Sequence, residues 1–147
     1  MKARHVLFTG SVDSSLCLVE LRARKAGEIA EFFWGKTTEE LLNLCRIGHE
    51  FDCLTVVVLT GQVLNQPEGR DVPNTINLIP DIRRFAPGIK IIAATARDDH
   101  NTHLMAAGCD QMVRYEHLPN HLFQLLTGCE ETPRTSLPQP GDVGYVI

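Results

Sequence analysis

The sequence predicts an α/β fold, in which a parallel β-sheet carries helices on both of its faces. Along the 147 residues, short apolar runs alternate five times with longer segments of helical periodicity, the pattern of successive strand-helix units. The run CLTVVVL, residues 53–59, is apolar without alternation. A strand buried on both faces of a parallel sheet is expected to look like this.

Each element of the alternation has expected bounds. The strands are expected at residues 5–8, 28–34, 53–59, 89–94 and 110–115. The helices are expected at residues 11–27, 36–48, 74–85, 98–108 and 118–126. No internal repeat is visible along the sequence.

Capping residues indicate where two of the helices begin and end. Ser11 or Asp13 is the expected N-cap of the first helix, and Thr37 or Thr38 that of the second, because their side chains accept hydrogen bonds from the first turn. Gly48 is expected to close the second helix, since glycine favours the backbone conformation found after helix ends.

Apolar spacing indicates which helix faces are buried. In the first helix, Leu16, Val19 and Leu21 recur at roughly helical spacing and are expected to face the sheet. Pro80 lies inside the third helical segment, where it would remove a hydrogen bond. That helix is therefore expected either to begin near Pro80 or to be kinked there.

Composition excludes several classes of function. The chain is 44% hydrophobic and 22% charged, and its net charge of -4 gives no electrostatic attraction to nucleic acid or to an anionic membrane. No apolar stretch approaches the roughly 18 residues that span a bilayer, and the first apolar run is too short for a signal peptide. The five cysteines are odd in number and show no CxxC spacing, which argues against a disulfide framework. We expect a cytoplasmic protein.

The sequence divides into a domain at residues 1–126 and a tail at residues 127–147. The tail is rich in Thr, Pro, Gln and Gly, a composition that predicts a flexible or extended segment. It ends in the apolar sequence GDVGYVI. This segment is expected either to add a strand to a partner's sheet or to lack fixed structure.

Residues 87–96 (PGIKIIAATA) and 105–119 (MAAGCDQMVRYEHLP) resemble the second half of a bacterial response-regulator receiver domain. The resemblance extends over roughly residues 5–126. It implies a flavodoxin-like, three-layer α/β/α fold whose five parallel strands have the order 2-1-3-4-5.

The resemblance also implies a phosphoryl-transfer site that this sequence does not reproduce. Receivers use an acidic pair after the first strand to hold Mg²⁺, an aspartate after the third as nucleophile, a hydroxyl after the fourth and a lysine after the fifth. The matching positions here are Thr9 with Gly10, Thr60, Thr95 and Tyr115. A count without gaps from Asp52 places the aspartate position at Val57 instead, and neither Val57 nor Thr60 is acidic.

These departures predict a degenerate member, or pseudo-receiver, that signals through protein contacts. We expect no enzyme activity, no phosphorylation on aspartate and no cofactor. The resemblance implies a protein partner or a homodimer, formed through the fourth helix, fifth strand and fifth helix, at residues 101–126.

An alternative is a small α/β protein, or an enzyme of uncharacterised type, that binds an anion or a divalent metal at the strand ends. The candidate anion ligands are Gly10, Ser11 and Thr60, because a loop before a helix offers backbone N–H groups. A metal cluster would consist of Asp98, Asp99, His100 and His117. The competing interpretation of these residues is as helix-terminal and surface side chains.

Overall fold

The computed structural model describes residues 3–60, residue 63 and residues 72–128. The strands are β1 (Arg4–Thr9), β2 (Ala30–Gly35), β3 (Leu54–Leu59), β4 (Lys90–Ala93) and β5 (Gln111–Met112). The α-helices are α1 (Ser14–Lys25), α2 (Thr38–Glu50), α3 (Leu78–Phe85), α4 (Asp98–Ala106) and α5 (Leu118–Thr127), and two 3₁₀ turns, η1 (Asn74–Asn77) and η2 (Tyr115–His117), precede α3 and α5.

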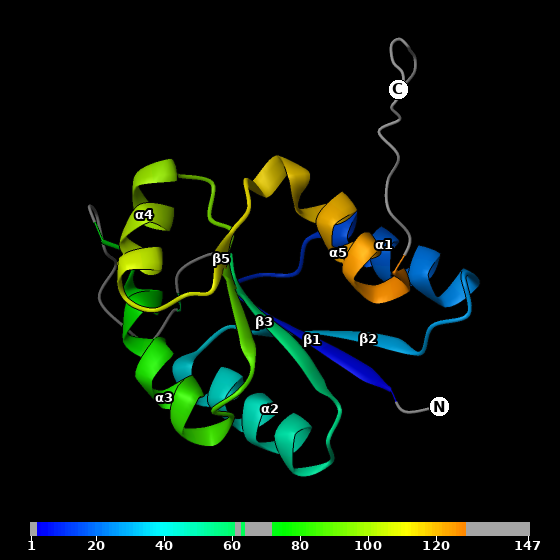
Figure 1. The fold of residues 1–147 in the computed structure, drawn as a ribbon, viewed down its shortest axis with the longest axis horizontal. Coiled ribbons are helices and arrows are strands. Elements are labelled where there is room, and N and C mark those ends of the chain that lie inside the picture. The colour runs from blue at the N-terminus through cyan, green and yellow to red at the C-terminus, as the bar shows by residue number, and fades with distance from the viewer. Residues whose placement is uncertain (1–2, 61–62, 64–71, 129–147) are drawn as a thin grey trace, which may run out of the picture.

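The strands form one parallel sheet in the order β2-β1-β3-β4-β5. Helices α1 and α5 lie together on one face, and α2, α3 and α4 cover the other (Figure 1). The predicted three-layer architecture and strand order are confirmed. The structure does not describe residues 129–147, so the predicted tail lies outside it apart from Thr127 and Gly128. None of the helices in the described part is long and apolar enough to cross a bilayer.

The central strands are buried on both faces, as the run at residues 53–59 predicts. In β3, Val56 and Val58 pack into the core under α1 and α5, whereas Val57 and Leu59 pack into the core under α2 and α3. All four side chains are fully buried. Because successive side chains of a strand point to opposite faces, only a strand covered on both sides takes such an unbroken apolar sequence.

The structure shows which of the two predicted residues is the N-cap of α1 and of α2. Asp13, not Ser11, caps α1, since its Oδ1 accepts a hydrogen bond from the Ser15 N–H at 2.8 Å. Thr37, not Thr38, caps α2, where its hydroxyl accepts from the Glu40 N–H at 3.1 Å. Both caps satisfy N–H groups that have no partner inside the helix.

Two residue assignments in these helices were wrong. Gly48 lies inside α2 rather than after it, and it is buried where a Cβ would stand 3.2 Å from the Cβ of Leu54. Gly48 therefore allows α2 to pack closely against Leu54. Leu21 is 55% exposed, and Ala23 takes the buried position instead, because the spacing from Leu16 to Ala23 follows the helix period more closely.

Pro80 lies in the first turn of α3, which begins at Leu78 directly after η1. The N–H groups of the first helical turn have no intrahelical partner, so a proline removes nothing there. The prediction that the helix begins near Pro80 is confirmed.

The fifth strand is shorter than predicted, at two residues instead of six. Flanking hydrogen bonds from Asp110 N to Ile91 O and from Val113 N to Ala93 O continue its contact with β4 at 2.9 Å each. The chain then turns into η2, so Tyr115 lies in a 3₁₀ turn and not in a strand. The bounds of β1, β2 and β4 differ from the prediction by one or two residues.

Candidate functional site

The ends of β1 and β3 are joined to each other by two side-chain hydrogen bonds. The Thr60 N–H donates to Thr9 Oγ1 at 3.0 Å, and the Thr60 hydroxyl donates to the Thr9 carbonyl oxygen at 2.6 Å. Thr9 is 1% exposed. The proton of the Thr60 hydroxyl is thus held by the backbone of β1, and neither of these two hydrogen bonds involves a base that would make Thr60 a nucleophile.

Thr60 and Val57 are the two predicted positions for the phospho-acceptor of receivers. Thr60 follows the last residue of β3, at the open end of the sheet. Val57 lies inside the strand and is fully buried between sheet and helices. Val57 has no access to solvent, whereas Thr60 does; that Thr60 matches the phospho-acceptor stays a prediction.

Gly10 and Ser11 lead from β1 toward α1. Gly10 has a φ of 95°, a left-handed conformation that favours glycine, and its N–H donates to the Gly35 carbonyl at 3.1 Å. Ser11 is exposed. The predicted anion site at Gly10, Ser11 and Thr60 thus has one of its N–H groups directed at β2, and the carboxylate of Asp13 stands at the same helix terminus. A bound anion there stays a prediction.

Thr95, at the end of β4, is fixed on both its backbone and its side chain. Asn101 Oδ1 accepts from the Thr95 N–H at 2.8 Å, and Asn101 Nδ2 donates to the Thr95 carbonyl at 3.2 Å. The Thr95 hydroxyl donates to the Arg97 carbonyl at 2.9 Å and accepts from the Arg97 N–H at 3.2 Å. The Thr95 hydroxyl, predicted to match the phosphoryl-contacting hydroxyl of receivers, is therefore hydrogen-bonded within its own loop.

The Tyr115 side chain contacts the beginning of α1. Its hydroxyl donates to Asp13 Oδ2, while Asp13 Oδ1 accepts from the N–H and the hydroxyl of Ser15. The hydrogen bonds from Tyr115 and then from Ser15 lower the pKa of Asp13. Burial, together with the hydrogen bond to Asp13, raises the pKa of Tyr115. The pair links the start of α1 to the turn before α5.

Sequence reasoning placed Tyr115 at the site but did not find Asp13 as its partner. Asp13 was predicted only as a possible N-cap of the first helix, a role that it also has. It is far from Tyr115 in the sequence, so no local pattern connects the two residues. One feature of the sequence could have suggested this pair. Asp13 is the single acid in the loop after the first strand, at the same end of the sheet as Tyr115.

Replacing Tyr115 by phenylalanine should make folding less sensitive to acid. An Asp whose pKa is lowered on folding adds stability above its unfolded pKa of about 3.9, and that stability is lost as the pH falls through the folded pKa. Between about pH 6 and about pH 3, the wild type should therefore lose more unfolding free energy than Tyr115→Phe. Urea unfolding at both pH values measures this difference.

The matched control for that experiment is Tyr145→Phe, the same change at the only other tyrosine of the chain. It should leave the pH dependence of the wild type unchanged. Equal pH dependence in wild type and Tyr115→Phe would show that the hydrogen bond to Asp13 contributes nothing to folding.

The four residues proposed as a metal cluster do not converge. Asp98 pairs with Arg114 at 3.2 Å, and Asp99 pairs with Arg97. His100 is buried in α4, at 5% exposure, whereas His117 is exposed in η2. Within residues 3–60, 63 and 72–128, no group of three or more His, Cys, Asp or Glu side chains has the arrangement of a metal site.

Buried thiols supply no nucleophile either. Burial raises the pKa of Cys45 to about 11 and that of Cys109 to about 12. Neither thiol is ionised near neutral pH, and the thiolate is the reactive form of cysteine. Both side chains belong to the core under α2 and α3.

A cavity of about 410 Å³ opens beside Thr95 at the carboxyl ends of β4 and β5. Its lining residues are Thr95, Ala96, Asp98, Arg114, Tyr115 and Glu116. The charged side chains of Asp98 and Arg114 pair with each other at its rim. Thr95 and Tyr115 direct their hydroxyl groups at protein atoms, at the Arg97 carbonyl and at Asp13, rather than at the cavity.

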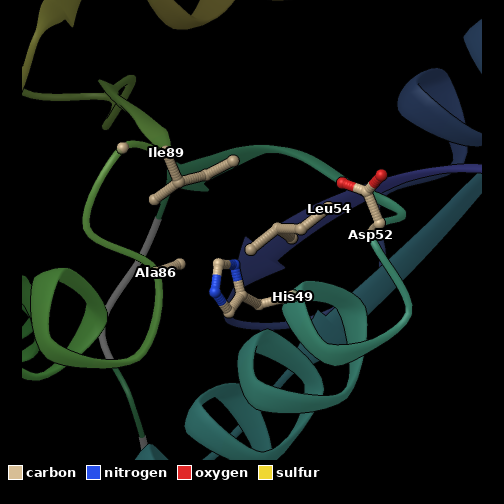
Figure 2. Close-up of a pocket in the computed structure, with 6 residues that line it drawn as sticks. His49, Asp52, Leu54, Ala86 and Ile89 are labelled. Carbon is tan, nitrogen blue, oxygen red and sulfur yellow. The ribbon is translucent and has the colours of Figure 1, made fainter.

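A second cavity, of about 200 Å³, lies at the opposite end of the sheet, between the end of α2 and the turn before β4. Figure 2 shows the His49 ring directed toward Ala86 and the Asp52 carboxylate set apart from it near Leu54. A His–Asp pair for acid-base catalysis requires the two side chains within hydrogen-bond reach. This cavity therefore presents no such pair.

Comparisons with known proteins agree with the fold. No family model matches the sequence, and no curated protein matches it. Among solved structures, the RcsB response regulator of Salmonella typhimurium matches with a TM-score of 0.57 and 18% identity, over 92% of this chain and 65% of the RcsB chain. The present chain thus spans slightly less than two thirds of RcsB.

Two further structures match over most of their own length. A CheY-like receiver domain of Methanospirillum hungatei has a TM-score of 0.57 and 18% identity, over 84% of this chain and 90% of that one. An atypical orphan response regulator has a TM-score of 0.56 and 11% identity, over 84% and 92%. Identities this low show the fold alone. The protein has the fold of the response-regulator receiver domains, a five-stranded parallel sheet of order 2-1-3-4-5 with five helices.

Proposed function

We propose that the protein is a pseudo-receiver, a non-catalytic signalling module that acts through protein contacts and is not phosphorylated on aspartate. The observation that carries this proposal is the hydrogen bonding at the strand ends. Thr60 stands where receivers have the phospho-acceptor, and its hydroxyl donates to the Thr9 carbonyl of the neighbouring strand. The position lacks a carboxylate, and its polar groups already bind protein atoms.

Three strand ends support the same proposal independently. Thr9 and Gly10 replace the acidic pair, so the loop after β1 offers no carboxylate at those positions for Mg²⁺, which prefers oxygen ligands of high charge. The Thr95 hydroxyl is bound to the backbone of Arg97. Tyr115 replaces the lysine and donates to Asp13. A phosphoryl group would find neither the metal nor the ammonium that stabilise it in receivers.

One of the matching structures gives a precedent for such a module. The atypical orphan response regulator is described as having a phosphorylation-independent regulatory mechanism. Its likeness to this chain is in fold, and a fold by itself does not determine function. The precedent supports the proposal only in that a receiver fold can regulate without phosphorylation.

The predicted contact face of α4, β5 and α5 remains part of the proposal. Met112, on β5, is 49% exposed and supplies this face with an apolar side chain. Its other exposed residues include Thr102, His103 and Asn120. A partner or a second copy bound there would meet a mostly polar surface, typical of transient rather than obligate interfaces.

Acetyl phosphate with Mg²⁺ should leave the protein unmodified. Because the carboxylate acceptor and the metal-binding acids are missing, intact-mass spectrometry should detect no phosphoryl adduct, whereas a receiver that has its aspartate, treated in parallel, should acquire one. An adduct that tandem mass spectrometry places on an aspartate, and that hydroxylamine removes as it does an acyl phosphate, would contradict the proposal.

A further inference from the structure

A cavity of about 240 Å³ lies between α5 and the last two strands of the sheet, β4 and β5. It is at the amino ends of these strands, because Lys90 is the first residue of β4 and Gln111 the first of β5. The strand ends that carry Thr95 and Tyr115 lie at the opposite end of the sheet. We call this space the α5 cavity. Its lining residues are Lys90, Gln111, His121, Gln124 and Leu125.

The register of the sheet directs two of these side chains at α5. Ile92, which pairs with Gln111 across the two strands, and Val113 both pack into the core under α1 and α5. Lys90 lies two residues before Ile92, and Gln111 lies two residues before Val113. Side chains two residues apart in an extended chain point to the same face, so Lys90 and Gln111 face α5. On α5, positions 121, 124 and 125 are three and four residues apart and share one side of the helix.

Lys90 brings a positive charge to the α5 cavity. Among the described residues, no ion pair includes Lys90. Asp110 lies close enough to Lys90 to interact with it electrostatically, but its carboxylate already pairs with Arg83 at 3.0 Å. The Lys90 ammonium group therefore offers a counter-charge to an anion in the cavity.

His121 indicates that the cavity lacks one of its partners. His121 Nε2 is buried and has no hydrogen-bond partner within the described part of the chain. Buried polar atoms of native proteins are nearly always paired, and an orphaned atom is one sign of a bound group that the chain does not itself supply. Burial, and then the charge of Lys90, lower the pKa of His121. Its ring is therefore neutral near pH 7 and adds no second positive charge.

The charge and the size of the α5 cavity favour a carboxylate. One ammonium group balances one negative charge, whereas a phosphate group carries about 1.5 to 2 at pH 7. The side-chain amides of Gln111 and Gln124 each have N–H donors that suit carboxylate oxygens. The volume is below the roughly 300–1,000 Å³ of pockets for drug-sized ligands. The occupant is therefore a small group rather than a cofactor.

We propose that the α5 cavity binds the carboxylate of an acidic side chain on a partner protein, with Lys90 as its counter-charge and with Gln111 and Gln124 as hydrogen-bond donors. Three of the lining residues, Gln111, His121 and Gln124, belong to the predicted contact face at residues 101–126. The inference rests on the proposed function and specifies the chemistry of its partner, which is an acidic segment. Charge pairing at such a contact steers association and selects the partner.

Sodium acetate, added to the full-length protein at constant ionic strength, supplies the carboxylate alone. In NMR spectra, the side-chain amide signals of Gln111 and Gln124 should shift and then saturate. The pKa of His121, measured from its ring proton signals, should rise, because the bound anion offsets the charge of Lys90. Shifts that grow without saturation, or that sodium chloride reproduces at equal ionic strength, would overturn the proposal.

Lys90→Met should lose the saturable shifts, since it removes the counter-charge and keeps an unbranched stem. Lys25→Met, at an exposed lysine of α1, is the matched control and should retain them. Gln124→Glu should also lose them, because it places a fixed carboxylate in the cavity. Far-UV circular dichroism should show that all three variants fold as the wild type does. Acetate binding that persists in Lys90→Met and in Gln124→Glu would contradict the proposal.

Two further probes distinguish the sources of the anion. Hexaglutamate should produce the same shifts at lower concentration than acetate, because a partner's segment also contacts the surface around the cavity. A cavity that responds to acetate but not to hexaglutamate would take free acids only, against the proposal. Inorganic phosphate should bind more weakly than acetate, and tighter binding of phosphate would contradict the assignment to a carboxylate.

These outcomes are distinguishable from those of the phosphorylation experiment. A protein that acquires no phosphoryl group and binds no acetate would overturn this inference alone. A protein that is phosphorylated on an aspartate and still binds acetate would overturn the proposed function, and the α5 cavity would remain a carboxylate site without that role.

Discussion

Replacing Asn101 by alanine should lower the free energy of unfolding by about 2–4 kcal/mol, since two hydrogen bonds to the Thr95 backbone are lost in a buried place. Asn101 is fully buried, and Thr95 is 6% exposed. The Asn101 amide accepts from the Thr95 N–H and donates to the Thr95 carbonyl. Alanine can do neither, and both backbone groups would be left without their partner in a region closed to water.

Urea unfolding followed by far-UV circular dichroism measures this change. The matched control is Thr102→Ala, at the next residue, where an exposed hydroxyl donates to the Asp98 carbonyl. It should change stability by about 0.5 kcal/mol or less, as surface substitutions do. Similar losses in both variants would mean that the Asn101 amide does not hold the end of β4. Asn101→Asp should rescue little, because a buried carboxylate cannot donate to the carbonyl.

Replacing Arg83 by methionine should cost about 1–2 kcal/mol of unfolding free energy, because it removes hydrogen bonds to three segments, two of them in exposed positions where water can take the place of the lost donor. The guanidinium donates to the Ile89 carbonyl at 2.5 Å, the Gly108 carbonyl at 2.9 Å and the Asp110 carboxylate at 3.0 Å. It thereby joins α3, the start of β4 and the turn before β5. Methionine retains the apolar stem but none of the donors.

Asp110 shows how closely this network is coupled. Burial raises the pKa of Asp110, but the hydrogen bonds from the Ile91 N–H and from Arg83 outweigh burial and lower that pKa overall. In Arg83→Met the carboxylate keeps only its backbone partner, so its pKa should rise. Carbon-13 NMR of the Asp110 carboxyl group during an acid titration measures that rise.

Arg84→Ala is the matched control for Arg83, one residue away on the same helix. Arg84 pairs with Asp81 on the helix surface at 2.7 Å, and its side chain is 71% exposed. Such pairs contribute about 0–1 kcal/mol. Arg83→Lys should recover only part of the loss, since an ammonium group lacks the planar fork that reaches three acceptors. Full recovery of the unfolding free energy in Arg83→Lys would show that Arg83 acts only through its charge.

Much of the fold could be predicted because strand burial and helix caps leave local signals. The unbroken apolar run of β3 predicted a central parallel strand, and the pair Thr37 and Thr38 predicted the start of α2. Gly48 was misassigned because packing against Leu54, a contact distant in sequence, and not local conformation, selects the glycine. The extent of β5 was also beyond local signals, since the sequence DQMVRY suits a strand, whereas the chain leaves β4 after Val113.

The position of the candidate site could be predicted from the sequence, but the hydrogen bonds within it could not. The predicted strand ends placed Thr9, Thr60, Thr95 and Tyr115 at the carboxyl end of the sheet. The structure has these four residues there. No local pattern pairs Tyr115 with Asp13, because that hydrogen bond depends on the packing of α5 against α1. It also did not reveal that the hydroxyls of Thr60 and Thr95 bind the backbone.

The central claim, that the strand-end site cannot take up a phosphoryl group, is tested most directly with beryllofluoride and Mg²⁺, which together mimic the phosphoryl group on a receiver aspartate. Amide NMR spectra of the full-length protein should remain the same on addition of both. Saturable shifts at Gly10, Thr60 and Thr95, at one equivalent of beryllofluoride and only with Mg²⁺, would contradict the claim.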